Sequence, residues 1–185
     1  MLHLVYGGSG SGKSAYAESL VEQYAGEKRY YLATMQVFGK EDEERVQRHR
    51  TMRQEKNFLT IEKPLDVGEV SAEPEATLLL ECMSNLVANE MFREPASCKS
   101  AREVTDKILA DIDRLAETVE NLVIVSANVF DDGLSYSEET TRYIRALADI
   151  NDGLAKRADF VTEVLVGIPL VLKEEGREVK ACAKS

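Results

Sequence analysis

The fold is decided by the stretch Gly7-Gly8-Ser9-Gly10-Ser11-Gly12-Lys13-Ser14, which completes the phosphate-binding pattern G-x-x-x-x-G-K-[ST]. It directly follows the apolar run Leu2–Tyr6, which predicts a buried strand, and leads into Ser14–Tyr24, whose apolar spacing predicts a helix. Glycines let such a loop turn backbone N–H groups towards an anion, and the helix dipole adds to the same point. We expect Lys13 to reach the β- and γ-phosphates of a nucleotide and the Ser14 hydroxyl to bind Mg²⁺. The alternative is a flexible glycine-serine turn that matches the pattern by accident.

The rest of the chain alternates short apolar runs with longer amphipathic stretches. The expected further strands are Arg29–Thr34, Ala76–Glu81, Asn121–Ala127, Phe160–Val166 and Leu170–Lys173. The expected further helices are Glu41–Gln54, Val104–Val119 and about Ser137–Ala158. Continuous apolar strands separated by helices predict a mainly parallel α/β sheet that is covered on both faces. The 185 residues therefore predict one domain over residues 1–173 and a polar C-terminal tail over 174–185.

The composition limits the class of function. Against 33 acidic residues stand 23 basic ones, a formal charge of -10, which argues against nucleic acid or an anionic membrane as partner. It remains compatible with a small phosphorylated ligand in a local pocket. The cysteines Cys82, Cys98 and Cys182 form no C-x-x-C pair, which indicates reduced thiols. Without a membrane-length apolar run or a signal peptide, we expect a soluble cytoplasmic protein.

A nucleotide site of this type also needs an acidic partner for the metal, usually at the end of a neighbouring strand. Glu81 ends the run Leu78–Leu80 and fits that role, so we assign the metal to Ser14 and Glu81. The alternative is a surface glutamate at a strand terminus. Asp159, which precedes the strand starting at Phe160, is a weaker competitor.

The two histidines have different surroundings. His3 lies among apolar residues of the first strand, which favours a buried structural role. His49 lies on a predicted helix that brings Arg45, His49 and Arg53 to one face. Surrounding arginines favour the neutral, nucleophilic imidazole, and the phosphates of a nucleotide are the obvious anion for such a stripe. The alternative is a solvated helix whose acidic start, Glu41–Glu44, complements its own dipole.

The order of these motifs resembles the bifunctional adenosylcobinamide kinase/adenosylcobinamide-phosphate guanylyltransferase family of cobalamin biosynthesis. The similar segments are the P-loop, RYYLAT, RVQRHR, TIEKP, LLLEC, VIVSANV, ADIN at 148–151 and GIPL at 167–170. The resemblance covers roughly residues 1–173. It implies a three-layer P-loop fold of the RecA-like kind and a homotrimer.

The resemblance also implies a two-step chemistry on a corrinoid. First, the primary hydroxyl of adenosylcobinamide takes the γ-phosphoryl group of GTP or ATP. A histidine, which falls on His49 here, then attacks the α-phosphate of GTP and passes GMP to the phosphorylated corrinoid, giving adenosyl-GDP-cobinamide. Further positions carried over to the nucleotide or metal site are Thr34, Arg50, Arg53, Glu62 and Glu81.

The chain departs from the family pattern at three places. Gly10 stands where the family P-loop has an arginine, which puts the kinase step in doubt. Asn128 stands where the family has a glutamate, residues 130–132 replace a glycine-rich turn, and Phe58 lies near the place of a usual tryptophan. Two alternatives therefore stay open: a small-molecule kinase in which His49 only clamps the triphosphate, and a non-catalytic nucleotide-binding regulator. By position alone, candidate corrinoid contacts are Asn85, Asn89 and Tyr136.

Overall fold

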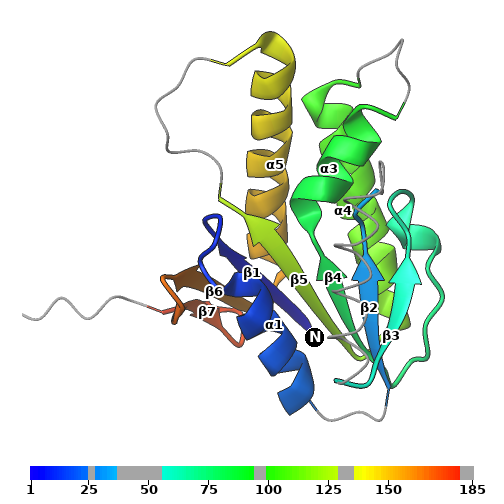
Figure 1. Cartoon of the computed structure of the whole chain (residues 1–185), viewed down its shortest axis with the longest axis vertical. Coiled ribbons are helices and arrows are strands. Elements are labelled where there is room, and N and C mark those ends of the chain that lie inside the picture. The colour runs from blue at the N-terminus through cyan, green and yellow to red at the C-terminus, as the bar shows by residue number, and fades with distance from the viewer. Residues whose placement is uncertain (25–27, 37–55, 94–98, 129–135, 180–185) are drawn as a thin grey trace, which may run out of the picture.

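The computed structural model describes residues 1–24, 28–36, 56–93, 99–128 and 136–179 (Figure 1). One eight-stranded sheet, in the order β3-β2-β4-β5-β1-β6-β7-β8, runs through these residues. The strands are β1 (Leu2–Gly7), β2 (Arg29–Ala33), β3 (Phe58–Glu62), β4 (Thr77–Glu81), β5 (Asn121–Ala127), β6 (Phe160–Leu165), β7 (Ile168–Glu174) and β8 (Arg177–Glu178). Strands β1 to β6 are parallel and β7 and β8 are antiparallel additions, which confirms the predicted mainly parallel α/β sheet.

Helices cover both faces of the sheet and make three layers (Figure 1). They are α1 (Lys13–Gln23), the short 3₁₀ helix η1 (Val67–Glu69), α3 (Met83–Met91), α4 (Ala101–Thr118) and α5 (Glu138–Arg157). Because side chains alternate along a strand, Leu78 and Leu80 pack towards α3, α4 and α5, whereas Leu79 packs towards α1. Both cores are closed to water, so the strands are apolar on both faces, as a parallel sheet requires.

The long helices follow local sequence signals. A capping box between Ser100 and Glu103 starts α4, and the Ser137 hydroxyl caps the first turn of α5. The buried stripe of α4 includes Val104, Ile108 and Ile112, as its spacing predicts. Among the helices of the described residues, none combines the length and hydrophobicity that crossing a membrane requires.

Three features differ from the prediction or lie beyond it. Strand β3 and helix α3 are absent from the predicted elements, because β3 is an edge strand with only Phe58 buried and α3 has only nine residues. Strand β7 continues to Glu174 and pairs with β8, so the sheet extends into the segment expected to be a tail. The predicted helix 41–54 lies outside the described residues.

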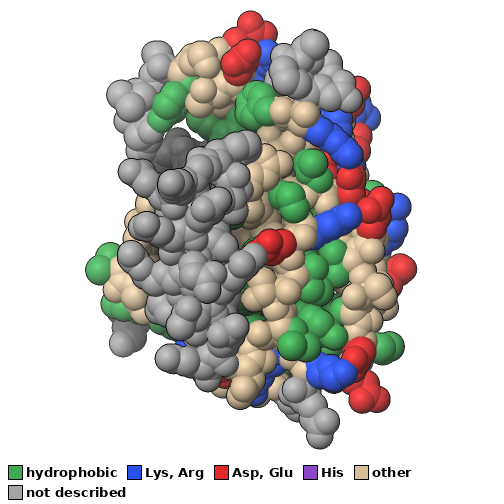
Figure 2. Space-filling model, turned by 45° about the vertical axis from the view of Figure 1, so that its right-hand side comes forward, with side chains coloured by type: hydrophobic (Ala, Val, Ile, Leu, Met, Phe, Trp, Pro, Cys, Tyr) green, Lys and Arg blue, Asp and Glu red, His purple; other side chains and the backbone are tan. Residues whose placement is uncertain are grey.

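The side of the molecule that faces right in Figure 1 has a mixed surface (Figure 2). Lys and Arg side chains lie beside Asp and Glu side chains there, with hydrophobic side chains scattered between them. Exposed ion pairs such as Lys63–Glu69, at 2.8 Å, contribute little to stability. The described candidate site residues lie elsewhere, at the carboxyl ends of the parallel strands.

Candidate nucleotide site

The P-loop connects β1 to α1 at the carboxyl edge of the sheet. Gly10 and Gly12 have φ angles of 69° and 90°, in the left-handed region that glycine adopts most easily. Helix α1 begins at Lys13, and among the described side chains none caps its first turn. Its first N–H groups are therefore free to bind an anion, and the positive end of the helix dipole favours one.

Two contacts fix the shape of this loop. The Gly167 N–H, from the turn between β6 and β7, donates to the Ser11 carbonyl at 2.8 Å. The Lys13 ammonium donates to the Gly8 carbonyl at 3.0 Å, so it lies across the loop that would hold the phosphates. The first contact anchors the loop to the β6–β7 turn, and the second holds a positive charge beside the loop, as a phosphate site requires.

Ser14 and Glu81 come together although 67 positions separate them in the chain. The Ser14 hydroxyl donates to Glu81 Oε1 at 2.6 Å. Because the hydroxyl gives its only proton to the carboxylate, its lone pairs stay available for a cation. Hydroxyl and carboxylate oxygens are the ligand types that Mg²⁺ prefers, so these two residues fit a magnesium ion.

Sequence reasoning missed Tyr31, which completes this group. Its hydroxyl donates to Glu81 Oε2 at 2.8 Å, so both oxygens of the carboxylate have a donor. Tyr31 is 4% exposed, and its ring packs edge-on against Phe58. The sequence of this strand, RYYLA, holds two adjacent tyrosines and does not single out Tyr31. Only the register with β4 shows that Tyr31 lies on the strand face that carries Glu81.

The other predicted nucleotide residues divide into two groups. Thr34 is fully buried, and its hydroxyl both donates to the Cys82 carbonyl and accepts from the Cys82 N–H, each at 2.8 Å. It thus ties the end of β2 to the end of β4. Glu62 ends β3 in register with Ala33, which is itself in register with Glu81, so the three lie in a row across the edge. His49, Arg50 and Arg53 lie outside the described residues, and their roles stay predictions.

Behind the P-loop, on the α5 face of the sheet, lies a cleft of about 470 Å³ lined by Tyr6, Asn128, Asn151 and Lys173 among others. Asn128 follows β5, the strand between β4 and β1, and its N–H donates to the Gly7 carbonyl at 3.0 Å. Asn151 binds the end of the same strand, accepting from the Ser126 hydroxyl at 2.5 Å. Burial, followed by the facing Glu163 carboxylate, raises the pKa of Tyr6. This cleft and the P-loop therefore share the junction of β1 and β5.

Other candidate residues have structural roles. His3 is buried, with its ring nitrogens 2.9 Å from the hydroxyls of Tyr24 and Thr162, and burial lowers its pKa to about 4. This confirms the predicted core histidine. Asp159 accepts from the Leu2 N–H at 2.8 Å, at the start of β1 and β6 rather than at their carboxyl ends, so it is no metal partner for the P-loop. The Asn89 amide donates to the carbonyls of Thr34 and Pro64.

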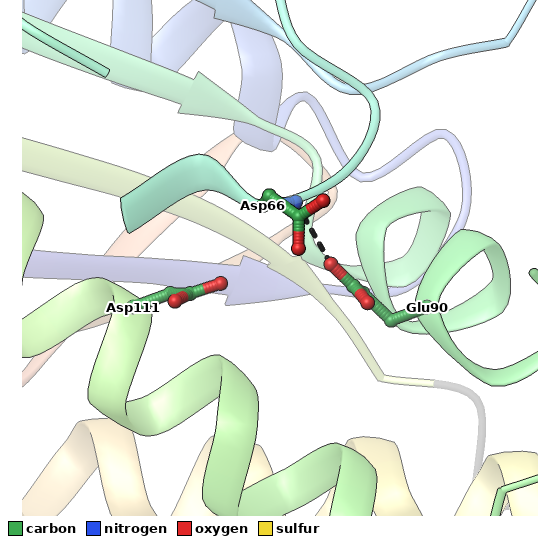
Figure 3. A group of neighbouring side chains, drawn as sticks. All are labelled: Asp66, Glu90 and Asp111. Carbon is green, nitrogen blue, oxygen red and sulfur yellow. Dashed lines mark hydrogen bonds between the residues drawn. The ribbon is translucent and has the colours of Figure 1, made fainter. Parts of the chain in front are cut away.

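A separate carboxylate cluster joins η1, α3 and α4 (Figure 3). It consists of Asp66, Glu90 and Asp111, and the Asp66 N–H donates to Glu90 at 2.8 Å. The Lys107 ammonium contacts all three carboxylates, at 2.9, 2.6 and 2.7 Å. Burial alone would lower the pKa of Lys107, but the hydrogen bonds to its three acidic neighbours raise it overall. The Lys107 ammonium thus takes the place of a metal ion, and the cluster holds η1, α3 and α4 together.

Fold and site together define a RecA-like P-loop α/β protein. An ATPase of a bacterial type III secretion system superposes with a TM-score of 0.55 at 10% identity, covering 92% of this chain and 56% of that one. A DnaB-like replicative helicase superposes with a TM-score of 0.50 at 11% identity, covering 96% of this chain and 58% of that one. At these identities the likeness concerns the fold alone.

The sequence comparison is more specific. The model of the family described as cobinamide kinase / cobinamide phosphate guanyltransferase matches residues 3–172. The bifunctional adenosylcobalamin biosynthesis protein CobP of Pseudomonas aeruginosa is 28% identical over 95% of this chain and 99% of its own length. CobU of Salmonella typhimurium is 31% identical over 94% of this chain and its own full length. The chain belongs to this family of bifunctional kinases and guanyltransferases, which confirms the resemblance seen in the sequence.

Proposed function

We propose that this protein phosphorylates adenosylcobinamide with GTP or ATP and then guanylylates the product through a GMP–His49 intermediate. The observation that carries the proposal is the joining of the P-loop to Glu81 through Ser14, within a chain that matches the family along almost its whole length. Family membership supports the pair of activities, and the geometry supports one triphosphate site at the carboxyl edge of the sheet.

In the kinase step, the corrinoid hydroxyl oxygen attacks the γ-phosphorus and its proton passes to water. The bond to the β-phosphate oxygen breaks, and the nucleoside diphosphate leaves. The N–H groups at the start of α1 and the Lys13 ammonium stabilise the negative charge on the phosphates. Mg²⁺ held by Ser14 and Glu81 would neutralise further charge on the phosphate oxygens. Glu62, Thr34, Arg50 and Arg53 remain proposed members of the nucleotide site.

In the guanylyl step, the neutral imidazole of His49 attacks the α-phosphorus of GTP and pyrophosphate leaves. A phosphate oxygen of the phosphorylated corrinoid then attacks the same phosphorus, and the bond to the imidazole breaks. Covalent catalysis of this kind splits one difficult transfer into two easier ones. The imidazole must be neutral to attack, because only the neutral ring has a free nitrogen lone pair.

The setting of the reaction is also part of the proposal. We infer a cytoplasmic homotrimer. Exposed apolar side chains on the hairpin of β6 and β7 support an assembly surface: Leu165, Val166, Ile168, Leu170, Val171 and Leu172. Sedimentation equilibrium would test the assembly, and a monomeric mass at micromolar concentration contradicts it.

The proposal is tested by incubating the protein with GTP labelled at the α-phosphate and Mg²⁺, without corrinoid, and measuring the intact mass after denaturation. We expect a GMP adduct that is lost in His49→Ala and in Lys13→Ala. His49→Ala should still form phosphorylated corrinoid from γ-labelled nucleotide, whereas Lys13→Ala should lose both steps. An adduct that persists in His49→Ala contradicts the intermediate. Equal loss of both steps in His49→Ala favours the simple kinase, in which His49 clamps the triphosphate.

A further inference from the structure

The buried Tyr31 and the half-buried Glu81 form a hydrogen-bonded pair beside the P-loop, and the proposed chemistry gives a role to Glu81 but none to Tyr31. Glu81 ends β4, and a glutamate in that place can rotate its carboxylate freely unless donors hold it. Two donors hold it here, Ser14 on Oε1 at 2.6 Å and Tyr31 on Oε2 at 2.8 Å. They come from α1 and β2, so the carboxylate is fixed from two separate elements.

We propose that Tyr31 is a positioning residue that orients the Glu81 carboxylate so that Ser14 presents its lone pairs to the metal of the nucleotide complex. This inference rests on the proposed function, because it takes Ser14 and Glu81 as the metal-binding pair. It adds a residue that touches neither the metal nor the nucleotide and acts only through Glu81.

The surroundings of Tyr31 make it rigid enough for this role. The side chain is 4% exposed and belongs to the core between the sheet and α1. Its ring lies 5.9 Å from the ring of Phe58 at 85°, an edge-to-face contact that fixes the ring plane. A ring held in this way fixes the position of the phenol oxygen, so the second oxygen of Glu81 has a donor at a set place.

The direction of the Ser14 hydroxyl depends on that position. If Glu81 rotates, its Oε1 no longer accepts from Ser14, and the hydroxyl proton turns towards other acceptors. A hydroxyl has one proton and two lone pairs, so a proton that points at the metal position excludes the cation. Loss of the Tyr31 hydroxyl should therefore weaken the binding of Mg²⁺ to the nucleotide complex while it leaves nucleotide binding without metal unchanged.

The test compares Tyr31→Phe with Tyr24→Phe. Both variants remove one phenol hydroxyl that makes a hydrogen bond within the protein, but the Tyr24 hydroxyl contacts His3 and not Glu81. Calorimetry measures the binding of α,β-methylene-GTP, which cannot release pyrophosphate, in EDTA and over a series of Mg²⁺ concentrations. The half-effect concentration is the Mg²⁺ concentration that gives half of the full gain in affinity. For Tyr31→Phe we expect it to rise about tenfold, the lower end of the typical weight of one hydrogen bond to a charged group. Affinity in EDTA should stay within about twofold, and Tyr24→Phe should behave as the natural protein does.

A third variant separates this inference from the proposed function. Glu81→Gln removes the charge itself and should raise the half-effect concentration more than Tyr31→Phe does. A shift in Glu81→Gln with none in Tyr31→Phe overturns the positioning role and leaves the proposed metal site standing. If the half-effect Mg²⁺ concentration is unchanged in Glu81→Gln, Glu81 does not bind the metal. That result overturns both the proposed metal site and the positioning role of Tyr31. Turnover gives a second readout: Tyr31→Phe should lose rate at low Mg²⁺ and recover its kcat at saturating Mg²⁺.

Discussion

Replacement of Lys107 by methionine should destabilise the fold strongly at neutral pH. The ammonium contacts Asp66, Glu90 and Asp111, and the side chains of Glu90 and Asp111 are 0% and 4% exposed. Removing one partner of a buried ion pair costs about 3–5 kcal/mol, because the remaining charges are left without compensation. Each carboxylate keeps another cation, namely Arg93 at 2.9 Å from Asp66, Lys99 at 3.7 Å from Glu90 and Arg114 at 2.5 Å from Asp111. These offset part of the loss, so we expect the lower end of that range, about 3 kcal/mol, at pH 7. Thermal unfolding should shift by about 6–12 °C, at roughly 2–4 °C per kcal/mol for a chain of this size.

The pH dependence of this loss identifies its cause. The hydrogen bond from Lys107, the first of several causes, lowers the pKa of Asp66, so that stabilisation is present above the ordinary carboxyl pKa and lost as pH falls through the lowered value. The pKa of Lys107 is raised, so its stabilisation is complete below the ordinary lysine pKa and lost as pH rises through the raised value. Both contributions are therefore intact at pH 7.

In Lys107→Met, the crowded carboxylates should take up protons more readily, so the deficit should shrink between pH 7 and pH 5. Urea unfolding of both proteins at these two pH values measures it. The control is Lys156→Met, whose ammonium pairs with Asp152 on the exposed face of α5 and should change stability by less than about 0.5 kcal/mol. A loss below about 1 kcal/mol at pH 7, or one of equal size at pH 5, would refute the reasoning.

Two further predictions concern glycines of the P-loop. A Cβ on Gly7 would lie 2.5 Å from the Val164 carbonyl oxygen, so Gly7→Ala should lower the free energy of unfolding by about 1–3 kcal/mol. Gly8→Ala is the matched control, because its Cβ meets nothing within 4 Å, and equal losses in urea unfolding would contradict the steric argument. Gly10 is exposed, and its Cβ position is open, but its φ is 69°, so Gly10→Arg should cost about 1 kcal/mol of stability. The added cation should lower the KM for the triphosphate about fivefold, which Gly10→Gln should not do.

The strands of the central sheet could be predicted because they are buried on both faces. Strand β5 has the predicted bounds, Asn121–Ala127, and the start of β4 differs from the prediction by one residue. Such strands read as continuous apolar runs because helices cover both sides of them. Strand β3 gives no such signal, since Leu59 is 51% exposed at the edge of the sheet. Helix α3 starts two residues after β4 ends, which leaves no loop to mark its beginning.

The candidate site was predictable only in part, for a related reason. The P-loop is continuous in sequence, so its pattern alone indicates a phosphate site. The bond from Tyr31 to Glu81 spans 50 positions, and the bonds between Thr34 and Cys82 span 48. These contacts depend on β2 and β4 being neighbours, although β3 lies between them in the chain. A single sequence shows residue types and spacing, and it does not show strand order.

Strand order also shows where two departures from the family pattern, Gly10 and Asn128, lie relative to Lys13, Ser14 and Glu81, which match that pattern. Glu81 ends β4, Asn128 follows β5 and the P-loop follows β1, so the three lie side by side along one edge. The Ser14–Glu81 pair and Lys13 are intact, and the role proposed for them concerns phosphates, which every nucleotide has. Gly10 is exposed and Asn128 lines the cleft behind the P-loop, so both substitutions lie beside the Ser14–Glu81 pair and leave it unchanged. A lost activity would therefore concern how the acceptor approaches the phosphates, and metal-dependent nucleotide binding should survive.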